Sequence, residues 1–149
     1  MTKKKNIAVP STERNIGKIR RELYRNAFGY LKSSVRANKW IEIIAISESI
    51  ICDRLESLIS KIEGKEREIL TIGGNLQKLK KLENEEMVKP IKPLLDEIKN
   101  WGKKRNKVLH EMVKVRIGEE NHSWKERLEY AKESALDGMK IARKISNMI

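Results

Sequence analysis

One segment of this 149-residue chain indicates both a fold and a chemistry: WGKKRNKVLHEMV, residues 101–113. Apolar residues recur at three- and four-residue spacing from Ile91 into this segment, which predicts an amphipathic α-helix. Arg105 falls at the centre of the apolar face, whereas Asn106 and His110 share one flank because they are four residues apart. Histidine can transfer a proton near neutral pH, and a neighbouring cation can stabilise a phosphate.

The composition favours a basic, helical protein with one core. Charged residues make up 36% of the chain and aromatic residues 5%, with only three prolines. The length of 149 residues suits a single domain. The net charge of +12 indicates an anionic partner, most often nucleic acid. A basic surface without a specific ligand stays open as an alternative.

Hydrophobic spacing and helix-end signals predict an all-α, single-domain bundle of four to five helices. Residues 1–10 are predicted to form a flexible basic arm, and residues 11–149 the helical domain. We expect a first helix that starts at residues 11–13, and Gly64 as the C-cap of the second. Ser123 and Glu126 form a capping-box pattern before the last helix. The expected helices span roughly 11–35, 39–63, 75–82, 90–117 and 123–149.

Two charged residues interrupt apolar stripes on different predicted helices. Glu48 lies inside the apolar arc of the second helix, as Arg105 does in the fourth. A buried charge is costly unless it is paired, so we predict that these two side chains face one another. Two interpretations remain: an ion pair that only fixes helix register, or a carboxylate that aims the guanidinium at a substrate phosphate.

The sequence predicts no metal site and no cofactor. Cys52 is the single cysteine, and the two histidines lie outside any metal-binding or glycine-rich motif. His122 is expected to be ordinary loop polarity. No apolar run is long enough to span a membrane, and the basic start is not followed by a signal-peptide core. We therefore expect a cytoplasmic protein with no membrane partner.

Two basic blocks are the candidate nucleic-acid-binding surfaces. Residues 1–36 hold ten Lys/Arg against two Asp/Glu, and residues 90–118 hold eight against three. Clustered cations of this kind bind phosphate backbones. The candidate contacts are Arg20, Arg21 and Arg25 in the first block, and Lys103, Lys104, Lys107 and Lys114 in the second.

The Arg105-Asn106-Lys-Val-Leu-His110 segment resembles the Arg-x(4–6)-His motif of the HEPN superfamily, in the variant with Asn directly after Arg. The segment that starts at Glu48, ESIICDRLE, is also similar to the long second helix of HEPN domains. The resemblance implies a helical bundle, usually dimeric, with metal-independent RNA-cleaving activity. It implies that Arg105 and His110 are the catalytic pair and that Asn106 supports them.

The expected function is therefore an endoribonuclease of toxin or antiviral-defence type that cleaves RNA by 2′-hydroxyl attack. We expect a homodimer through a flank of Asn106, His110, Val113 and Ile117, and a cognate antitoxin or regulatory protein stays open as a partner. Met112 stands where HepT-group toxins carry a tyrosine, which argues against regulation by AMP addition. Some HEPN members only bind, so a non-catalytic RNA- or protein-binding module is the alternative.

Overall fold

The computed structural model describes residues 15–149, which form five packed α-helices, one short 3₁₀ helix and no strand. The all-α, single-domain prediction is confirmed. The arm predicted at 1–10 and the helix start predicted at 11–13 lie outside the described residues. The elements are α1 (Ile16–Arg36), α2 (Trp40–Glu63), α3 (Ile72–Lys81), η1 (Lys89–Ile91), α4 (Lys92–Glu111) and α5 (Trp124–Met148).

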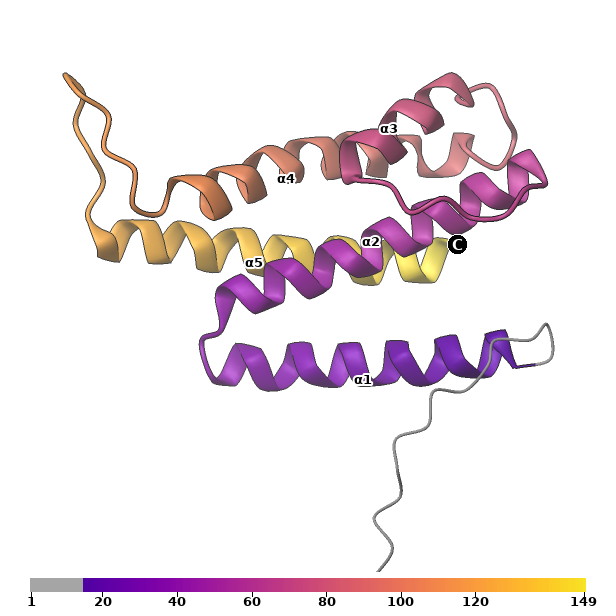
Figure 1. Cartoon of the computed structure of the whole chain (residues 1–149), viewed down its shortest axis with the longest axis horizontal. Coiled ribbons are helices and arrows are strands. Elements are labelled where there is room, and N and C mark those ends of the chain that lie inside the picture. Colours follow the sequence, from indigo (N-terminus) through magenta and orange to yellow (C-terminus); the bar gives the residue numbers. More distant parts are fainter. Residues whose placement is uncertain (1–14) are drawn as a thin grey trace, which may run out of the picture.

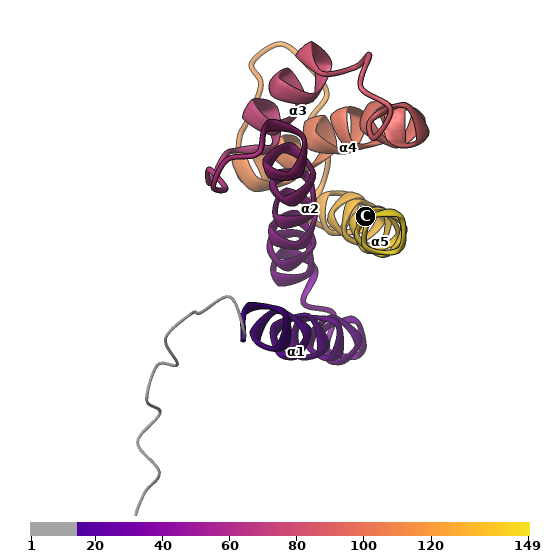
Figure 2. The ribbon, with the colours of Figure 1, turned by 90° about the vertical axis from the view of Figure 1, so that its right-hand side faces the viewer.

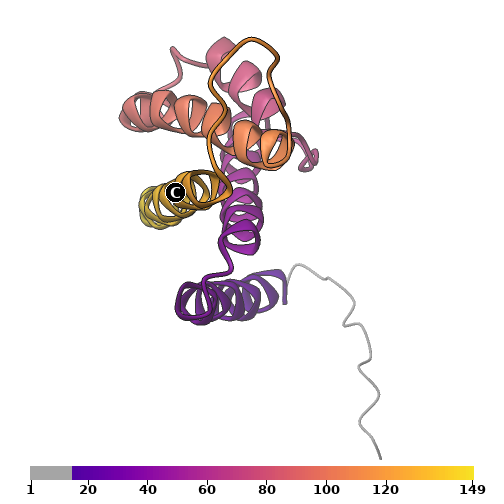
Figure 3. The same ribbon diagram turned by 90° about the vertical axis from the view of Figure 1, so that its left-hand side faces the viewer.

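Helix α2 runs through the centre of the bundle (Figure 1). End views place α1 on one side of it and α3 and α4 on the other, with α5 alongside (Figures 2 and 3). Burial on α2 is not confined to one narrow stripe, because Ile43, Ile44, Ile50 and Ile51 are all buried while Ile41 is 43% exposed. A helix with neighbours on several sides buries more than one stripe, which a single periodic pattern does not predict.

Helix α1 packs on α2 through a polar cluster centred on Asp53. Tyr24 donates a short hydrogen bond to the Asp53 carboxylate, and Arg54 Nε donates to the Tyr24 hydroxyl at 3.0 Å. Arg67 Nη1 lies 2.6 Å and Arg20 Nε 3.7 Å from the same carboxylate. Burial, followed by the bond to Asp53, raises the pKa of Tyr24 to about 12, so the hydroxyl stays a donor at neutral pH.

Small residues on α5 let α4 approach closely. The Trp101 ring is 2% exposed, and its Nε1 donates to the Ser134 carbonyl at 2.8 Å. The ring lies against Gly138, where an added Cβ would come within 2.5 Å of Trp101 Cζ2. The small residues Ala131, Ala135 and Ala142 on this face of α5 are fully buried.

Helix ends follow the local signals in most places. Gly64 caps α2 in the left-handed conformation with φ 64°. Ser123 Oγ accepts from the Glu126 amide at 3.2 Å, which confirms the capping box. Thr71 Oγ1 accepts from Gly74 N at 3.0 Å, so α3 begins at Ile72, three residues before its predicted start.

The predicted end of the fourth helix is wrong, because α4 stops at Glu111 and does not reach Ile117. The Arg127 guanidinium closes it: Nη1 donates to the carbonyls of Glu111 at 2.7 Å, Met112 at 3.1 Å and Lys114 at 2.8 Å. The Glu111 and Met112 carbonyls lie at the helix end, where intrahelical partners run out, and the Lys114 carbonyl ties the start of the arch to the same guanidinium. Residues 112–123, called the arch below, rise from the bundle to a narrow tip between α4 and α5 (Figure 1).

Candidate catalytic and nucleic-acid site

The structure brings Arg105 and Glu48 together, as predicted from their places in two apolar stripes. Arg105 Nη1 lies 2.6 Å from Glu48 Oε1, and the two side chains are 18% and 24% exposed. Within residues 15–149 the buried Arg105 Nε has no hydrogen-bond partner. The pair joins α4 to α2, and the guanidinium keeps donors that Glu48 does not use.

Asn106 and His110 lie on the exposed side of α4, one helical turn apart. Against residues 15–149 the His110 ring makes no hydrogen bond or ion pair, so no side chain there fixes its orientation. Arg105 and His110 are five positions apart, which at about 100° per residue separates them by about 140° around the axis. The two predicted catalytic side chains of one copy therefore point to different sides of α4.

The predicted phosphate-binding lysines of α4 have different surroundings. Lys103 is exposed and forms no ion pair with the described residues. Lys104 Nζ lies 3.1 Å from Asp137 and 3.4 Å from Glu133 on α5. The hydrogen bond to Asp137 is the main cause of a raised Lys104 pKa. Lys104 is therefore already paired, whereas Lys103 is available to a ligand.

The two basic blocks do not form one surface within a protomer. Arg20 contacts Asp53, while Arg21 and Arg25 are exposed on α1. Figures 2 and 3 show α2 between α1 and α4, so these arginines lie away from the α4 lysines. Lys114, the remaining predicted contact, stands on the arch and not on a helix.

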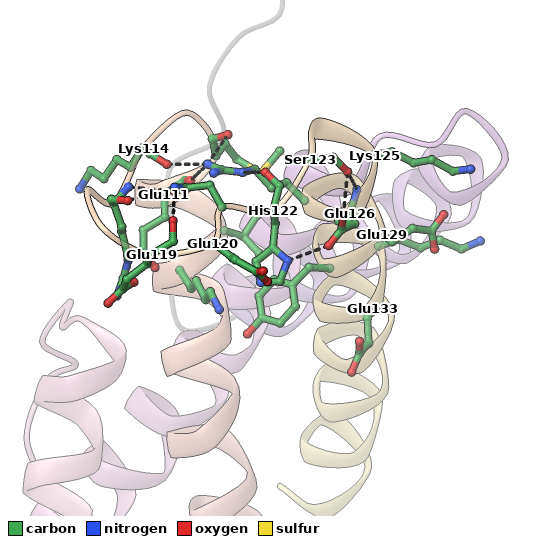
Figure 4. A pocket seen from close by; sticks show the side chains of 18 of the residues that line it. Glu111, Lys114, Glu119, Glu120, His122, Ser123, Lys125, Glu126, Glu129 and Glu133 are labelled. Atoms are coloured by element: carbon green, nitrogen blue, oxygen red, sulfur yellow. Dashed lines mark hydrogen bonds and ion pairs between the residues drawn. The ribbon is translucent and has the colours of Figure 1, made fainter.

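A groove of about 990 Å³ lies under the arch, between the end of α4 and the start of α5 (Figure 4). Its lining contains Lys107 and Tyr130, with Lys107 Nζ 5.0 Å from the centre of the Tyr130 ring. His122 also lines it, whereas Arg105, Asn106 and His110 do not. The groove and the predicted catalytic residues therefore occupy different parts of the α4 surface.

Sequence reasoning named Lys107 and Lys114 of this lining as nucleic-acid contacts, but it predicted neither the groove nor a role for His122 in it. His122 Nδ1 lies 2.7 Å from Glu126 Oε2, and this contact is the first cause of a lowered Glu126 pKa. Arg127, which closes α4, was not singled out either. The four-residue spacing of His122 and Glu126 was a usable signal, but nothing local could reveal that Arg127 reaches the end of another helix.

Other chemistry finds little support in residues 15–149. No group of three His, Cys, Asp or Glu side chains lies close enough there to hold a metal ion. Burial, followed by Glu48 and Glu56, raises the pKa of the Cys52 thiol to about 12, which leaves little thiolate at neutral pH. Within the same range, no helix is long and apolar enough to span a membrane.

Comparison with protein-family models, with curated proteins and with solved structures found no match to this chain.

Proposed function

We propose that this protein is a metal-independent endoribonuclease of HEPN type that acts as a toxin or antiviral-defence effector. The observation that carries the proposal is the arrangement of the Arg-Asn-x-x-x-His segment on α4. Arg105 is held by Glu48 at 2.6 Å, and Asn106 and His110 are open to solvent on the same helix. The exposed Lys103 and the net charge of +12 suit a polyanionic substrate.

The reaction follows from the residue types. His110 takes the proton of an RNA 2′-hydroxyl, and the resulting oxygen attacks the adjacent phosphorus. The P–O5′ bond breaks, and the leaving oxygen receives a proton from an acid, for which a second His110 is suited. The products are a 2′,3′-cyclic phosphate and a 5′-hydroxyl. Arg105 stabilises the extra negative charge of the phosphorane, and Asn106 positions a substrate oxygen.

The geometry of α4 favours a homodimer for this reaction. One copy offers a single histidine on the exposed side of α4, whereas the reaction uses both a base and an acid. A second copy placed across the exposed side of α4 supplies a further histidine beside the same phosphate. Val113 and Ile117 do not extend this flank along α4, because both residues belong to the arch. Lys103, Asn106 and His110 remain as the helical part of the proposed interface.

A second candidate is a non-catalytic RNA- or protein-binding module, which two observations favour. The Arg105 guanidinium is already neutralised by Glu48. The His110 ring has no hydrogen-bond partner among residues 15–149 to set its tautomer. A cytoplasmic location and restraint by a cognate antitoxin belong to the nuclease proposal and rest on the resemblance to HEPN toxins.

The test is incubation of the purified protein with end-labelled RNA in EDTA, beside His110→Ala and His122→Ala. We expect cleavage that persists in EDTA and leaves cyclic phosphate ends. His110→Ala should reduce the rate about 10²–10⁴-fold, the usual contribution of a general acid or base. His122→Ala is the matched control, since His122 lies in the groove instead, and it should cleave at the normal rate.

A substrate with a single 2′-deoxy nucleotide at the cleavage site should remain intact, because the attacking group is missing. Cleavage that requires an added divalent metal would refute the mechanism. RNA binding without turnover, weakened by loss of lysines but not of His110, would establish the binding module instead.

A further inference from the structure

The first run of the arch has the pattern of a β-strand, although it forms no strand pair. Its sequence is Val113-Lys-Val-Arg-Ile117, in which β-branched and basic residues alternate. Val113 is 83%, Val115 76% and Ile117 99% exposed. Three large apolar side chains side by side in solvent are unusual, and exposed apolar patches commonly mark contact surfaces.

The two sets of side chains point in different directions. Lys114 and Arg116 line the groove beneath the arch, whereas Val113, Val115 and Ile117 are not part of that lining. Figure 4 shows Lys114 at the rim of the groove. Side chains of an extended chain alternate between two faces. This run therefore turns Lys114 and Arg116 towards the groove, where Arg116 is paired with Glu111, and its apolar side chains towards solvent.

One backbone edge of this run is already hydrogen-bonded. The Asn121 side chain accepts from Arg116 N at 2.8 Å and donates to Arg116 O at 3.0 Å. The Lys114 carbonyl accepts from Arg127 at 2.8 Å. Residues 114–116 lie between turns at Val113 and Ile117, and backbone groups of an extended chain alternate between its edges, so those of Val115 belong to the other edge and Ile117 follows at the turn. Across residues 15–149 neither Val115 nor Ile117 makes a hydrogen bond.

We propose that residues 113–117 are a docking edge for an extended segment of a partner protein in which apolar and acidic residues alternate. The partner adds a strand along the free edge and accepts and donates main-chain hydrogen bonds at Val115 and Ile117. Its apolar side chains cover the exposed apolar face, and its acidic side chains lie beside Lys114 and compete with Glu111 for Arg116. This proposal goes beyond the nuclease function and does not depend on it.

Charge decides between this partner and a second copy of the chain. Any antiparallel pairing of two such runs that puts the apolar residues on one face also places basic residues opposite basic residues. Like charges directly opposite one another destabilise a strand pair. An acidic, alternating segment replaces the repulsion at Lys114 with attraction and keeps the apolar pairing.

The experiment is an NMR titration of the ¹⁵N-labelled protein with a short peptide of alternating valine and glutamate. We expect the amide signals of residues 113–117 to move, with binding detectable at or below about 1 mM peptide. Val115→Pro removes the free N–H but suits an extended backbone, so it should weaken binding at least about tenfold without unfolding the protein. In this variant, the amide signal of Ile117 reports whether the peptide still binds.

A matched pair of variants separates this edge from exposed apolar surface in general. Ile117 and Ile69 are 99% and 94% exposed, and Ile69 lies in the loop before α3. Ile117→Ser should weaken peptide binding several-fold, whereas Ile69→Ser should leave it unchanged. Circular dichroism melting curves show whether each variant keeps the fold.

Three results would overturn the proposal. The first is that no amide signal of residues 113–117 moves at about 1 mM peptide. The second is equal binding of a peptide with lysine in place of glutamate. The third is self-association that Val115→Pro abolishes, which would make a second copy the occupant. No RNA is present, so each result leaves the proposed nuclease activity to its own test.

Discussion

The two faces of α4 come from one short sequence and have opposite surroundings. On the inner face, Ile98, Trp101 and Val108 are at most 2% exposed and pack in the core. On the outer face, Lys103, Asn106 and His110 are exposed. Core packing restricts the inner face to side chains of fitting size and polarity. The outer face contacts solvent, so it can hold charged and reactive side chains. Arg105 belongs to the inner face by position, yet it carries the charge expected of the outer one.

The largest effect on folding is expected on the inner face, from Gly138→Ala. The new Cβ would lie 2.5 Å from Cζ2 and 2.8 Å from Cε2 of Trp101, closer than packed atoms come. The Trp101 ring is held by its bond to Ser134, so relief requires moving a helix. We expect a loss of about 1–3 kcal/mol in the free energy of unfolding, measured by urea denaturation.

Gly29→Ala is the matched control for that substitution. Gly29 lies within α1, and no atom stands within 4 Å of the position of its Cβ. Alanine favours the helix over glycine, so this variant should gain about 0.5–1 kcal/mol. Equal changes at the two glycines would show that the close contact between α4 and α5 does not determine stability.

Local and periodic signals in the sequence predicted much of this fold. The Ser123 cap, the Gly64 cap and the meeting of Glu48 with Arg105 each depend on residue type and spacing alone. The end of α4 depends on Arg127, which reaches it from the next helix, and no local pattern contains that contact.

The same missed contact explains errors at the start of α5. Helical periodicity puts Trp124 and Leu128 on the core face of the last helix, but they are 59% and 39% exposed. Helix α4 ends before it could cover them, because the chain leaves the bundle as the arch. For the candidate site, the sequence predicted the pairing of Arg105 but not the groove, whose lining comes from the arch as well as from two helices.

A smaller effect is expected where the two faces meet, at Glu48. Glu48→Ala leaves the Arg105 guanidinium mostly buried without its partner, which should cost about 1–3 kcal/mol in the free energy of unfolding. Glu48→Gln keeps one acceptor and should cost less. If Glu48 also aims Arg105 at the substrate, Glu48→Gln should lower RNA cleavage while most of the protein stays folded.

Denaturation curves of the two variants measure the stability effect, and single-turnover cleavage rates test whether Glu48 aims Arg105. A Glu48→Gln protein that cleaves RNA at the normal rate would reduce the pair to a structural role. If Glu48→Ala leaves the free energy of unfolding unchanged, water must hydrate the Arg105 guanidinium in place of Glu48. Arg105 would then belong to the outer face of α4.

The smallest effect on stability is expected from Lys103→Met on the outer face. Lys103 has no ion pair with the described residues, so the free energy of unfolding should change by no more than about 0.5 kcal/mol. Its neighbour Lys104 is the control, since Asp137 and Glu133 already hold it.

If Lys103 contacts a phosphate of single-stranded RNA, its loss should reduce the slope of log affinity against log salt by about 0.7. Lys104→Met should leave that slope unchanged and affect folding instead. Filter binding at several salt concentrations measures the slope, and equal slopes in the two variants would mean that the outer face of α4 is not the RNA surface.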